Sequence, residues 1–147
     1  MRITSRFTVA VHILLAIITF EKEHKTTSDF LAASVNVNPV VVRRVLGSLK
    51  EAGIVTVKAG SGGASLARDA ASVTLYDVYK AVDDNDGGLF HFHENPDPAC
   101  PVGKNIHLVL DRYLDDAQAA LENELKKTAL SNLAFRLNKA LRMQGNA

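Results

Sequence analysis

The sequence predicts a mainly α-helical chain that carries one small β-hairpin and a long helix near its C-terminus. Three observations lead to this fold class. Residues 27–53 read as two short helices joined by a tight turn. Residues 54–68 read as two strands on either side of a glycine-rich loop. Residues 103–126 follow one long amphipathic repeat.

Length and charge are consistent with one domain plus an oligomerisation arm. The chain has 147 residues, and 47% of them are hydrophobic, which is enough for a sizeable core. The net charge is only +1, but it is unevenly distributed. Residues 1–69 hold nine Lys and Arg against five Asp and Glu, whereas residues 70–147 hold eight against eleven. The first half is therefore the candidate nucleic-acid-binding half.

The single cysteine and the first apolar stretch bear on location. One cysteine cannot form an internal disulfide, which favours a reducing compartment. Residues 7–20 are apolar but too short to span a bilayer, contain His12, and lack a small-residue cleavage site after them. We interpret them as a buried core helix of a cytoplasmic protein that has no membrane partner.

Residues 27–53 carry the signals of two consecutive helices. Thr27 suits the start of the first helix, and Asn36 tolerates the left-handed conformation that ends one. Asn38 can cap the second helix, and Pro39 fits its first position because no amide hydrogen is needed there. Gly53 suits the end of that helix. The segment is predicted to be a helix-turn-helix.

The second of these helices has a buried and an exposed side. Its core positions repeat at helical spacing: Val42, Val45, Leu46 and Leu49. The exposed side then holds Val40, Val41, Arg43, Arg44 and Lys50. An arginine pair near the helix start lies where a recognition helix meets base edges. Two helices and a turn also occur in proteins that bind no DNA, and an arginine pair is often only a solvated face.

The segment that follows favours DNA binding. Residues 54–59 alternate as a strand, residues 60–63 are a loop with little side-chain bulk, and residues 64–68 read as a return strand. A helix-turn-helix followed directly by a β-hairpin is a winged helix. Lys58 and Arg68 are expected to flank the loop, whose glycines allow a close approach to a phosphate or a narrow minor groove.

The next segments complete a body over residues 1–82 and a linker over residues 83–102. Thr74 is expected to cap a helix over residues 75–82, with an apolar stripe of Leu75, Val78, Tyr79 and Val82. Residues 83–88 break this helix. Residues 89–102 look irregular, with two histidines, three prolines and the single cysteine, and are the expected sensor or linker region.

The last part, residues 103–147, is predicted to hold a dimerisation helix and a C-terminal helix. The apolar stripe of the long helix is Ile106, Leu110, Leu114, Ala117, Leu121 and Leu125, widened by Val109, Tyr113 and Ala120. At about 1.5 Å per residue this helix runs roughly 35 Å, which exceeds what the small body can cover. A partner copy is the expected cover, and folding back within the monomer is the alternative. Thr128 is expected to cap a short last helix, and the tail after Leu141 to be disordered.

The chain resembles the Rrf-type family of bacterial winged-helix transcriptional regulators, which includes an iron–sulfur-cluster regulator, a nitric-oxide-sensing repressor and a cysteine-metabolism repressor. The residues that carry the resemblance are residues 1–6 (MRITSR), 52–55 (AGIV), 60–66 (GSGGASL), 73–75 (VTL) with Val78, and 100–103 (CPVG). Together they cover nearly the whole chain, and they are specific as a set rather than one by one.

The resemblance implies a homodimeric, sequence-specific DNA-binding regulator, with repression as the expected direction. The long helices would pair across a two-fold axis and place two wings on a palindromic operator of double-stranded DNA. The implied phosphate contacts are Arg2, Thr4, Ser5 and Arg6. The expected major-groove residues are Val40, Val41, Arg43 and Arg44. Asn38 at the helix start is a further expected DNA-binding residue, and the expected wing contacts are Lys58, Gly60, Ser61, Gly62 and Gly63.

No catalytic constellation is present in the sequence, so we expect no enzyme. The spacing of His91, His93, Cys100 and His107 matches no common zinc pattern, and we expect no metal site. Members of the family that bind a cluster carry three cysteines at C-x5-C-x5-C. Aligning Cys100 with the middle one places Glu94 and Ile106 at the outer positions, so we expect the branch without a cluster and no cofactor.

Cys100 remains the candidate sensor residue. A helix start favours the thiolate, and Lys104 or His107 could add positive charge. The alternative is an inert cysteine that fills a small gap. The competing interpretations of the whole chain are a winged-helix protein that binds a small molecule or a metal without acting through DNA, and a winged helix used for protein contact. The effector is unknown from sequence.

Overall fold

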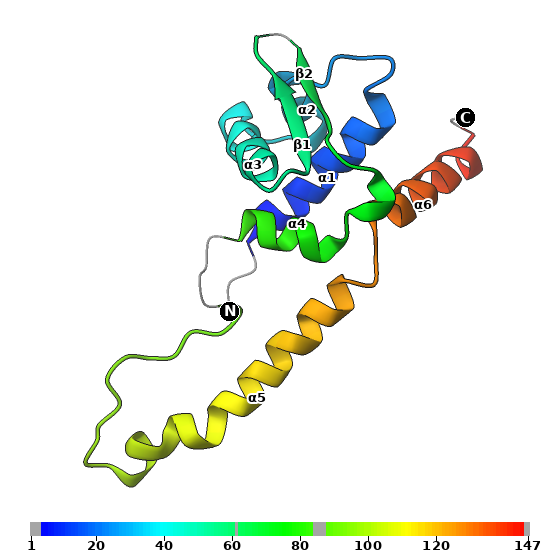
Figure 1. The fold of residues 1–147 in the computed structure, drawn as a ribbon. Helices are drawn as coiled ribbons and strands as arrows, with labels where there is room; N and C mark the ends of the chain where they lie inside the picture. The colour runs from blue at the N-terminus through cyan, green and yellow to red at the C-terminus, as the bar shows by residue number, and fades with distance from the viewer. Residues whose placement is uncertain (1–3, 61, 84–87, 146–147) are drawn as a thin grey trace.

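The computed structural model describes residues 4–60, 62–83 and 88–145. These residues form six α-helices, one 3-10 helix and one two-stranded antiparallel hairpin, which confirms the predicted fold class (Figure 1). In chain order the elements are α1 (Ser5–Phe20), α2 (Ser28–Val35), α3 (Pro39–Glu51), β1 (Val55–Lys58), β2 (Gly63–Leu66), η1 (Ala70–Ser72), α4 (Leu75–Val82), α5 (Pro101–Leu125) and α6 (Leu130–Met143).

Helix α1 lies at the centre of the hydrophobic core, as predicted for the first apolar stretch. Ile13, Leu14 and Ile17 are fully buried, and they belong to one cluster with side chains from α2, α3 and α4. The helix begins at Ser5 rather than residue 7, because the Thr4 side chain accepts a hydrogen bond from the Arg6 amide. None of the helices in the described part of the chain has the length and apolar character needed to cross a bilayer.

The helix-turn-helix has the predicted caps. The Thr27 hydroxyl accepts from the Phe30 amide at 3.2 Å, and the Asn38 side chain accepts from the Val40 amide at 2.9 Å. The backbone of Asn36 adopts the left-handed conformation with φ 63°, so the chain changes direction between α2 and α3. Gly53 also has a positive φ of 75°, and it follows the end of α3 as predicted. Local capping chemistry therefore determines where both helices begin and end.

The hairpin is tied to the loop that precedes α2. Strand β1 pairs with β2 in a register that sets Val55 opposite Leu66 and Lys58 opposite Gly63, so both strands are shorter than predicted. The Ala64 amide donates to the Thr26 carbonyl at 2.9 Å, and the buried Thr26 hydroxyl donates to the Ala64 carbonyl. This backbone contact fixes the wing against the helix-turn-helix.

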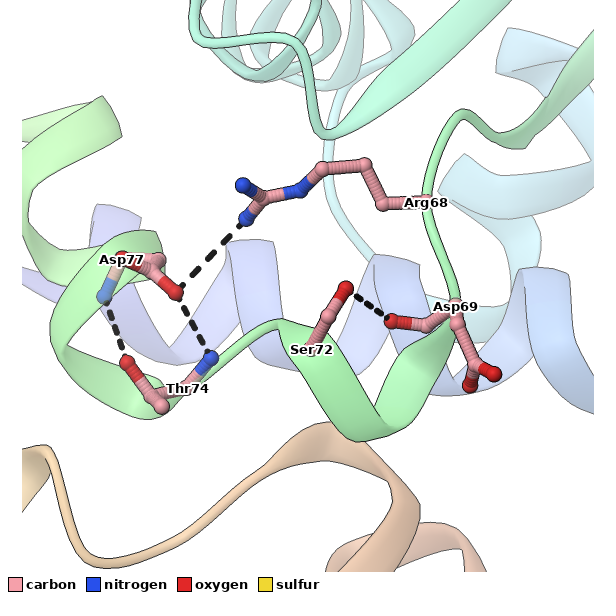
Figure 2. Close-up of polar contacts among 5 residues, drawn as sticks. All are labelled: Arg68, Asp69, Ser72, Thr74 and Asp77. Atoms are coloured by element: carbon pink, nitrogen blue, oxygen red, sulfur yellow. Dashed lines mark hydrogen bonds and ion pairs between the residues drawn. The ribbon is translucent and has the colours of Figure 1, made fainter.

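A second set of contacts fixes the base of the wing to α4 (Figure 2). Thr74 and Asp77 form a reciprocal capping box, in which the Asp77 amide donates to Thr74 and the Thr74 amide donates to Asp77. Arg68 reaches across from the end of the hairpin to Asp77, with 3.6 Å between the charged atoms. The sequence predicted Arg68 beside the wing tip. The structure places it at the base, because it lies beyond the pairing of Val55 with Leu66.

Helix α5 extends away from the body, and α6 returns to it (Figure 1). None of the 25 residues of α5 is buried. At its end the Leu75 amide donates to the Thr128 carbonyl at 2.9 Å, and the Leu130 amide donates to the Val73 carbonyl at 2.8 Å. This short bridge holds the start of α6 against the start of α4, and it buries Leu130 completely.

Two predictions about the C-terminal segment are wrong. Thr128 does not cap the last helix, because its carbonyl is part of the bridge and the residue before α6 is Ala129, whose amide donates to the Asn132 side chain. The helix is also not short. It continues to Met143 where a disordered tail after Leu141 was expected, because its first two turns pack Leu130 and Leu133 against the core.

Candidate nucleic-acid interface

Helix α3 has one buried and one exposed side, as the sequence predicts. Val42, Val45 and Leu49 are fully buried and hold the helix against α1. On the other side, Val40 is 49% exposed and Val41 is 37% exposed. Lys50 is exposed as well, and Asn38 is exposed beside the helix start. Two large apolar side chains therefore face solvent at the beginning of a helix whose opposite side is anchored in the core.

The two arginines of α3 differ in their partners. Arg43 lies 3.9 Å from the carboxylate of Asp29 on α2, in an exposed and loose ion pair. Arg44 is exposed and makes no ion pair or hydrogen bond with another residue in the described part of the chain. The guanidinium of Arg44 is free for a ligand, whereas that of Arg43 has a competing carboxylate nearby.

The wing presents Lys58 next to a glycine loop. Lys58 is exposed and lies at the end of β1. A Cβ atom at Gly62 would lie 2.3 Å from the Cβ of Lys58, so the chain can pass this side chain only without a side chain of its own. Gly60 has a φ of 74°, which other residues rarely adopt. Gly63 also has a positive φ, and its Cβ would lie 3.0 Å from the Thr26 amide nitrogen. Ser61 lies outside the described residues.

The start of α1 holds the third predicted group of contacts. Thr4 and Ser5 are exposed, and Arg6 is half-buried. The Thr4 hydroxyl already caps the helix, and the Ser5 carbonyl accepts from the Thr8 hydroxyl at 3.0 Å. Arg2 lies outside the described residues. The N-terminal turn is thus ordered by its own caps, and it presents short polar side chains to solvent.

Cys100 occupies the residue position just before α5. It is half-exposed, and the backbone amides of Gly103 and Val102 lower the pKa of its thiol. The predicted positive charge of His107 does not act there, because the His107 ring nitrogen instead lies 3.1 Å from Asp111. Within the described ranges no three His, Cys, Asp or Glu side chains gather in a metal-ligand geometry.

Sequence reasoning missed three partners of this surface. Thr26 anchors the wing, Asp29 competes for Arg43, and Asp77 holds Arg68. Only the last had a local signal, since Thr74 and Asp77 have the spacing of a capping box. The other two join residues 38 and 14 positions apart, which periodicity cannot detect.

Comparison with known proteins shows what this arrangement is similar to. The sequence model of the Rrf2 family, described as an iron-dependent transcriptional regulator, matches residues 3–136. The chain is 48% identical over 131 residues to YwnA of Bacillus subtilis (strain 168), which is named as an HTH-type transcriptional regulator. The match covers 89% of this chain and 96% of YwnA.

Solved structures have the same fold. A crystal structure described as that of a DNA-binding protein is 45% identical, covers 88% of this chain and 98% of its own, and superposes with a TM-score of 0.71. T. potens IscR is 15% identical with a TM-score of 0.69, over 95% of this chain and 90% of its own. CymR of B. subtilis, named a global cysteine regulator, is 19% identical with a TM-score of 0.64. The match covers 91% of this chain and 96% of the CymR chain. The last two likenesses concern the fold alone.

Proposed function

The chain belongs to the Rrf2 family of transcriptional regulators rather than to a class of enzymes, and from this premise we propose that it is a cytoplasmic, homodimeric repressor that binds a palindromic operator. The three parts proposed are a DNA-binding body over residues 1–82, a sensor segment over residues 83–102, and a dimerisation arm with its C-terminal helix over residues 103–147.

The observation that carries the proposal is the two-sided character of α3. Its buried side fixes the helix in the core, while Val40, Val41 and Arg44 face solvent in the first two turns. In a helix-turn-helix these turns meet base edges in the major groove. Exposed valines suit contact with thymine methyl groups, and an arginine without a protein partner suits bidentate contact with guanine.

The wing and the N-terminus supply the expected backbone contacts. Lys58 lies beside a loop in which Gly60, Gly62 and Gly63 have no side chains to hold the backbone away from a phosphate or a narrow minor groove. Thr4, Ser5 and Arg6 lie in the first turn of α1, where amide hydrogens and short hydroxyl groups suit a phosphate oxygen. These contacts would position α3 without reading sequence.

Dimerisation through α5 is supported by its uncovered apolar side. Val109 is 61% exposed and Tyr113 is 68% exposed, one turn apart on a helix of 25 residues that has no buried residue. A helix with such a stripe reaches stability by pairing with another. Two copies related by a two-fold axis would place two α3 helices on the two halves of a palindrome.

Iron dependence, which the family description includes, does not fit the residues of this chain. A protein-held iron–sulfur cluster uses several thiolates, and the sequence has one cysteine. No three candidate ligands converge anywhere in residues 4–60, 62–83 or 88–145. We therefore propose a cluster-free regulator and derive no step through iron.

Cys100 is the proposed thiol switch. Backbone amides lower the pKa of its thiol, and the residue is partly accessible, so a thiolate would form more readily than at an ordinary cysteine. Its place just before α5 links its modification to the arm that spaces the two α3 helices. Operator binding by wild type and Cys100→Ser, before and after mild peroxide, tests this role. If both proteins respond alike, Cys100 is not the switch.

The main test is selection of duplexes from a random-sequence library by the purified protein, followed by affinity measurements across a salt series. We expect enrichment of one palindrome, and an affinity that falls steeply with salt because phosphate contacts release counterions. Absence of any enriched sequence at low salt would contradict the proposal. It would favour the alternative of a winged-helix protein that binds a small molecule or a metal, or another protein, without acting through DNA.

A further inference from the structure

A cavity of about 300 Å³ lies between α5 and the segment that leads into it. The segment from residue 88 runs back along α5 (Figure 1), and it contributes Phe90 and Phe92 to the cavity wall. The helix contributes His107, Asp111, Leu114, Asp115 and Gln118. These positions follow helical spacing, so they form one face of α5.

This face adjoins the predicted apolar stripe at Leu114, which belongs to both, and lies opposite Val109 and Tyr113, the two exposed residues proposed for dimerisation. Asp111 follows Val109 by two positions, which is about 200° around the helix axis. Pairing of two copies through Val109 and Tyr113 would therefore leave the cavity open. The two sides of the same helix are available for two different partners.

The walls of the cavity are set in place by specific contacts. The Leu89 amide donates to the Gln118 side chain at 2.7 Å, and Gln118 donates in turn to Glu122 at 3.0 Å. The Phe92 ring lies over the His107 ring with 4.1 Å between centroids, and His107 is held by Asp111 at 3.1 Å. The aromatic side and the helix side are thus joined at both ends of the cavity.

The side chains that line the cavity favour a positively charged ligand. Two aromatic rings offer electron-rich faces, and two carboxylates lie one turn apart on the helix side. Asp115 is exposed and makes no hydrogen bond or ion pair with any other described residue, so its charge is not compensated by the protein. Two aromatic rings and two carboxylates, of which that of Asp115 has no partner among the described residues, attract a cation that also carries apolar groups.

We propose that this cavity binds a small organic cation, an amine or a quaternary ammonium compound. The cationic nitrogen would lie between the carboxylates of Asp111 and Asp115, with its carbon substituents against Phe90, Phe92 and Leu114. The volume suits a molecule of a few carbon atoms rather than a nucleotide. An anion is excluded by the two carboxylates.

A series of side-chain contacts connects the cavity to the DNA-binding body. The regulatory effect inferred from these contacts rests on the proposed function. Gln118 donates a hydrogen bond to Glu122, and Tyr76 on α4 lies close enough to lower the pKa of the Glu122 carboxyl. The ammonium group of Lys126 lies over the Tyr76 ring at 4.6 Å. Binding at one end of this chain of contacts would change how α5 is held against α4, and hence the spacing of the two α3 helices.

The binding test uses choline and its neutral isostere 3,3-dimethyl-1-butanol, which differ only in the charged atom. Titration of the full-length protein without DNA, followed by the NMR signal of the Gln118 side-chain amide, measures occupancy of this cavity. We expect choline to shift that signal to saturation and the alcohol to leave it unchanged. n-Butylammonium and 1-butanol form a second pair, and binding of either cation in preference to its alcohol supports the site.

Variants locate the site within the molecule. Asp111→Asn combined with Asp115→Asn keeps the shape of the cavity and should weaken binding about tenfold, in line with an ion held by carboxylates and aromatic faces. Asp116→Asn removes the same charge from the same helix outside the cavity, and its affinity should equal that of the wild type. Phe92→Leu should weaken binding while it preserves an apolar wall.

Outcomes separate this inference from the proposed function. Equal binding of cation and alcohol, or no binding of either cation at millimolar concentration, overturns the cation site whatever the protein does with DNA. Cation binding that leaves operator affinity unchanged removes the regulatory step and keeps the site. Cation binding by a protein that enriches no DNA sequence keeps the site and overturns the proposed repressor.

Discussion

The body and the arm of this molecule are both built from amphipathic helices, but only the body covers its apolar side chains. Helices α1 and α3 place Ile13, Leu14 and Leu49 in one core where they are fully buried. Helix α5 is longer than either, and none of its residues is buried. The comparison teaches that periodicity predicts which face of a helix is apolar. It does not predict whether the same chain or another molecule covers that face.

The largest expected effect is a loss of core packing. Leu49→Ala removes a fully buried side chain between α3 and α1, and we expect it to lower the free energy of unfolding by about 2–5 kcal/mol. Val109→Ala makes the same kind of truncation on α5, where the side chain is 61% exposed, and should change monomer stability by no more than about 0.5 kcal/mol. Urea unfolding at low protein concentration compares the two. Equal losses would mean that the arm is part of the body.

The second prediction reverses the roles of the two regions. Val109→Glu combined with Tyr113→Glu places charges on the uncovered stripe, and should leave a folded monomer. Loss of the second half-site should then weaken operator binding by about 100-fold or more. Sedimentation at micromolar concentration measures association, and helical circular dichroism checks that the body is intact. A wild-type protein that sediments as a monomer would contradict the proposed dimer.

The third prediction separates base recognition from spacing. Arg44→Ala should lower operator affinity by about 1–3 kcal/mol and relax sequence preference, while association stays unchanged. Arg43→Ala should cost less, because Arg43 has Asp29 as a competing partner at 3.9 Å. Operator binding of both variants across a salt series is the measurement. A larger loss of affinity for Arg43→Ala would mean that DNA displaces Asp29 from Arg43. Arg43, and not Arg44, would then be the main base contact.

The sequence was sufficient for elements whose ends depend on local chemistry. Thr27, Asn36, Asn38 and Gly53 each act within a few residues, and the structure has them in the predicted roles. It was not sufficient where the deciding contact is distant. Thr128 reads as a helix cap, but its backbone bridges to α4 some 50 residues earlier, and this bridge displaces the start of α6.

The candidate interface divides in the same way. The exposure of Val40, Val41, Arg43 and Arg44 follows from helical periodicity and was predicted. The difference between the two arginines was not, because it depends on Asp29 in another helix. The cavity beside α5 was also not predicted, since it arises where an irregular segment lies against a helix and neither shows a repeat.

A smaller effect compares one glycine from each region. Gly47 lies inside α3 with nothing within 4 Å of an added Cβ, so Gly47→Ala should stabilise the body by about 0.5–1 kcal/mol. Gly103 lies in the first turn of α5, and its Cβ would come within 2.5 Å of the Asp97 carbonyl oxygen. That carbonyl accepts from the Cys100 amide, so Gly103→Ala must shift this turn. Thermal unfolding of both variants should give opposite signs, and equal gains would show that the turn yields freely.

The smallest effect is expected at the joint between the two regions, where Tyr76 of α4 meets Glu122 of α5. The Gln118 side chain donates a hydrogen bond to Glu122, and this bond, together with the nearby Tyr76, lowers the pKa of the Glu122 carboxyl below its ordinary value of 4.5. A carboxyl whose pKa is lowered in the folded state stabilises the joint fully at a pH above its ordinary pKa. This stabilisation is lost as the pH falls through the lowered pKa of the folded state. Partial burial and Glu122 raise the pKa of Tyr76 above 10.0, so this hydroxyl keeps its proton up to that pH and favours the folded state below it. The Gln118 side-chain amide signal should therefore stay constant from about pH 6 to about pH 9 and move only in acid, below the ordinary carboxyl pKa of 4.5, where protonation makes Glu122 a weaker hydrogen-bond acceptor. Tyr76→Phe removes one donor and should shift this transition to higher pH. A transition unchanged by Tyr76→Phe would show that Gln118 alone sets the pKa and that α4 and α5 are not joined through this pair.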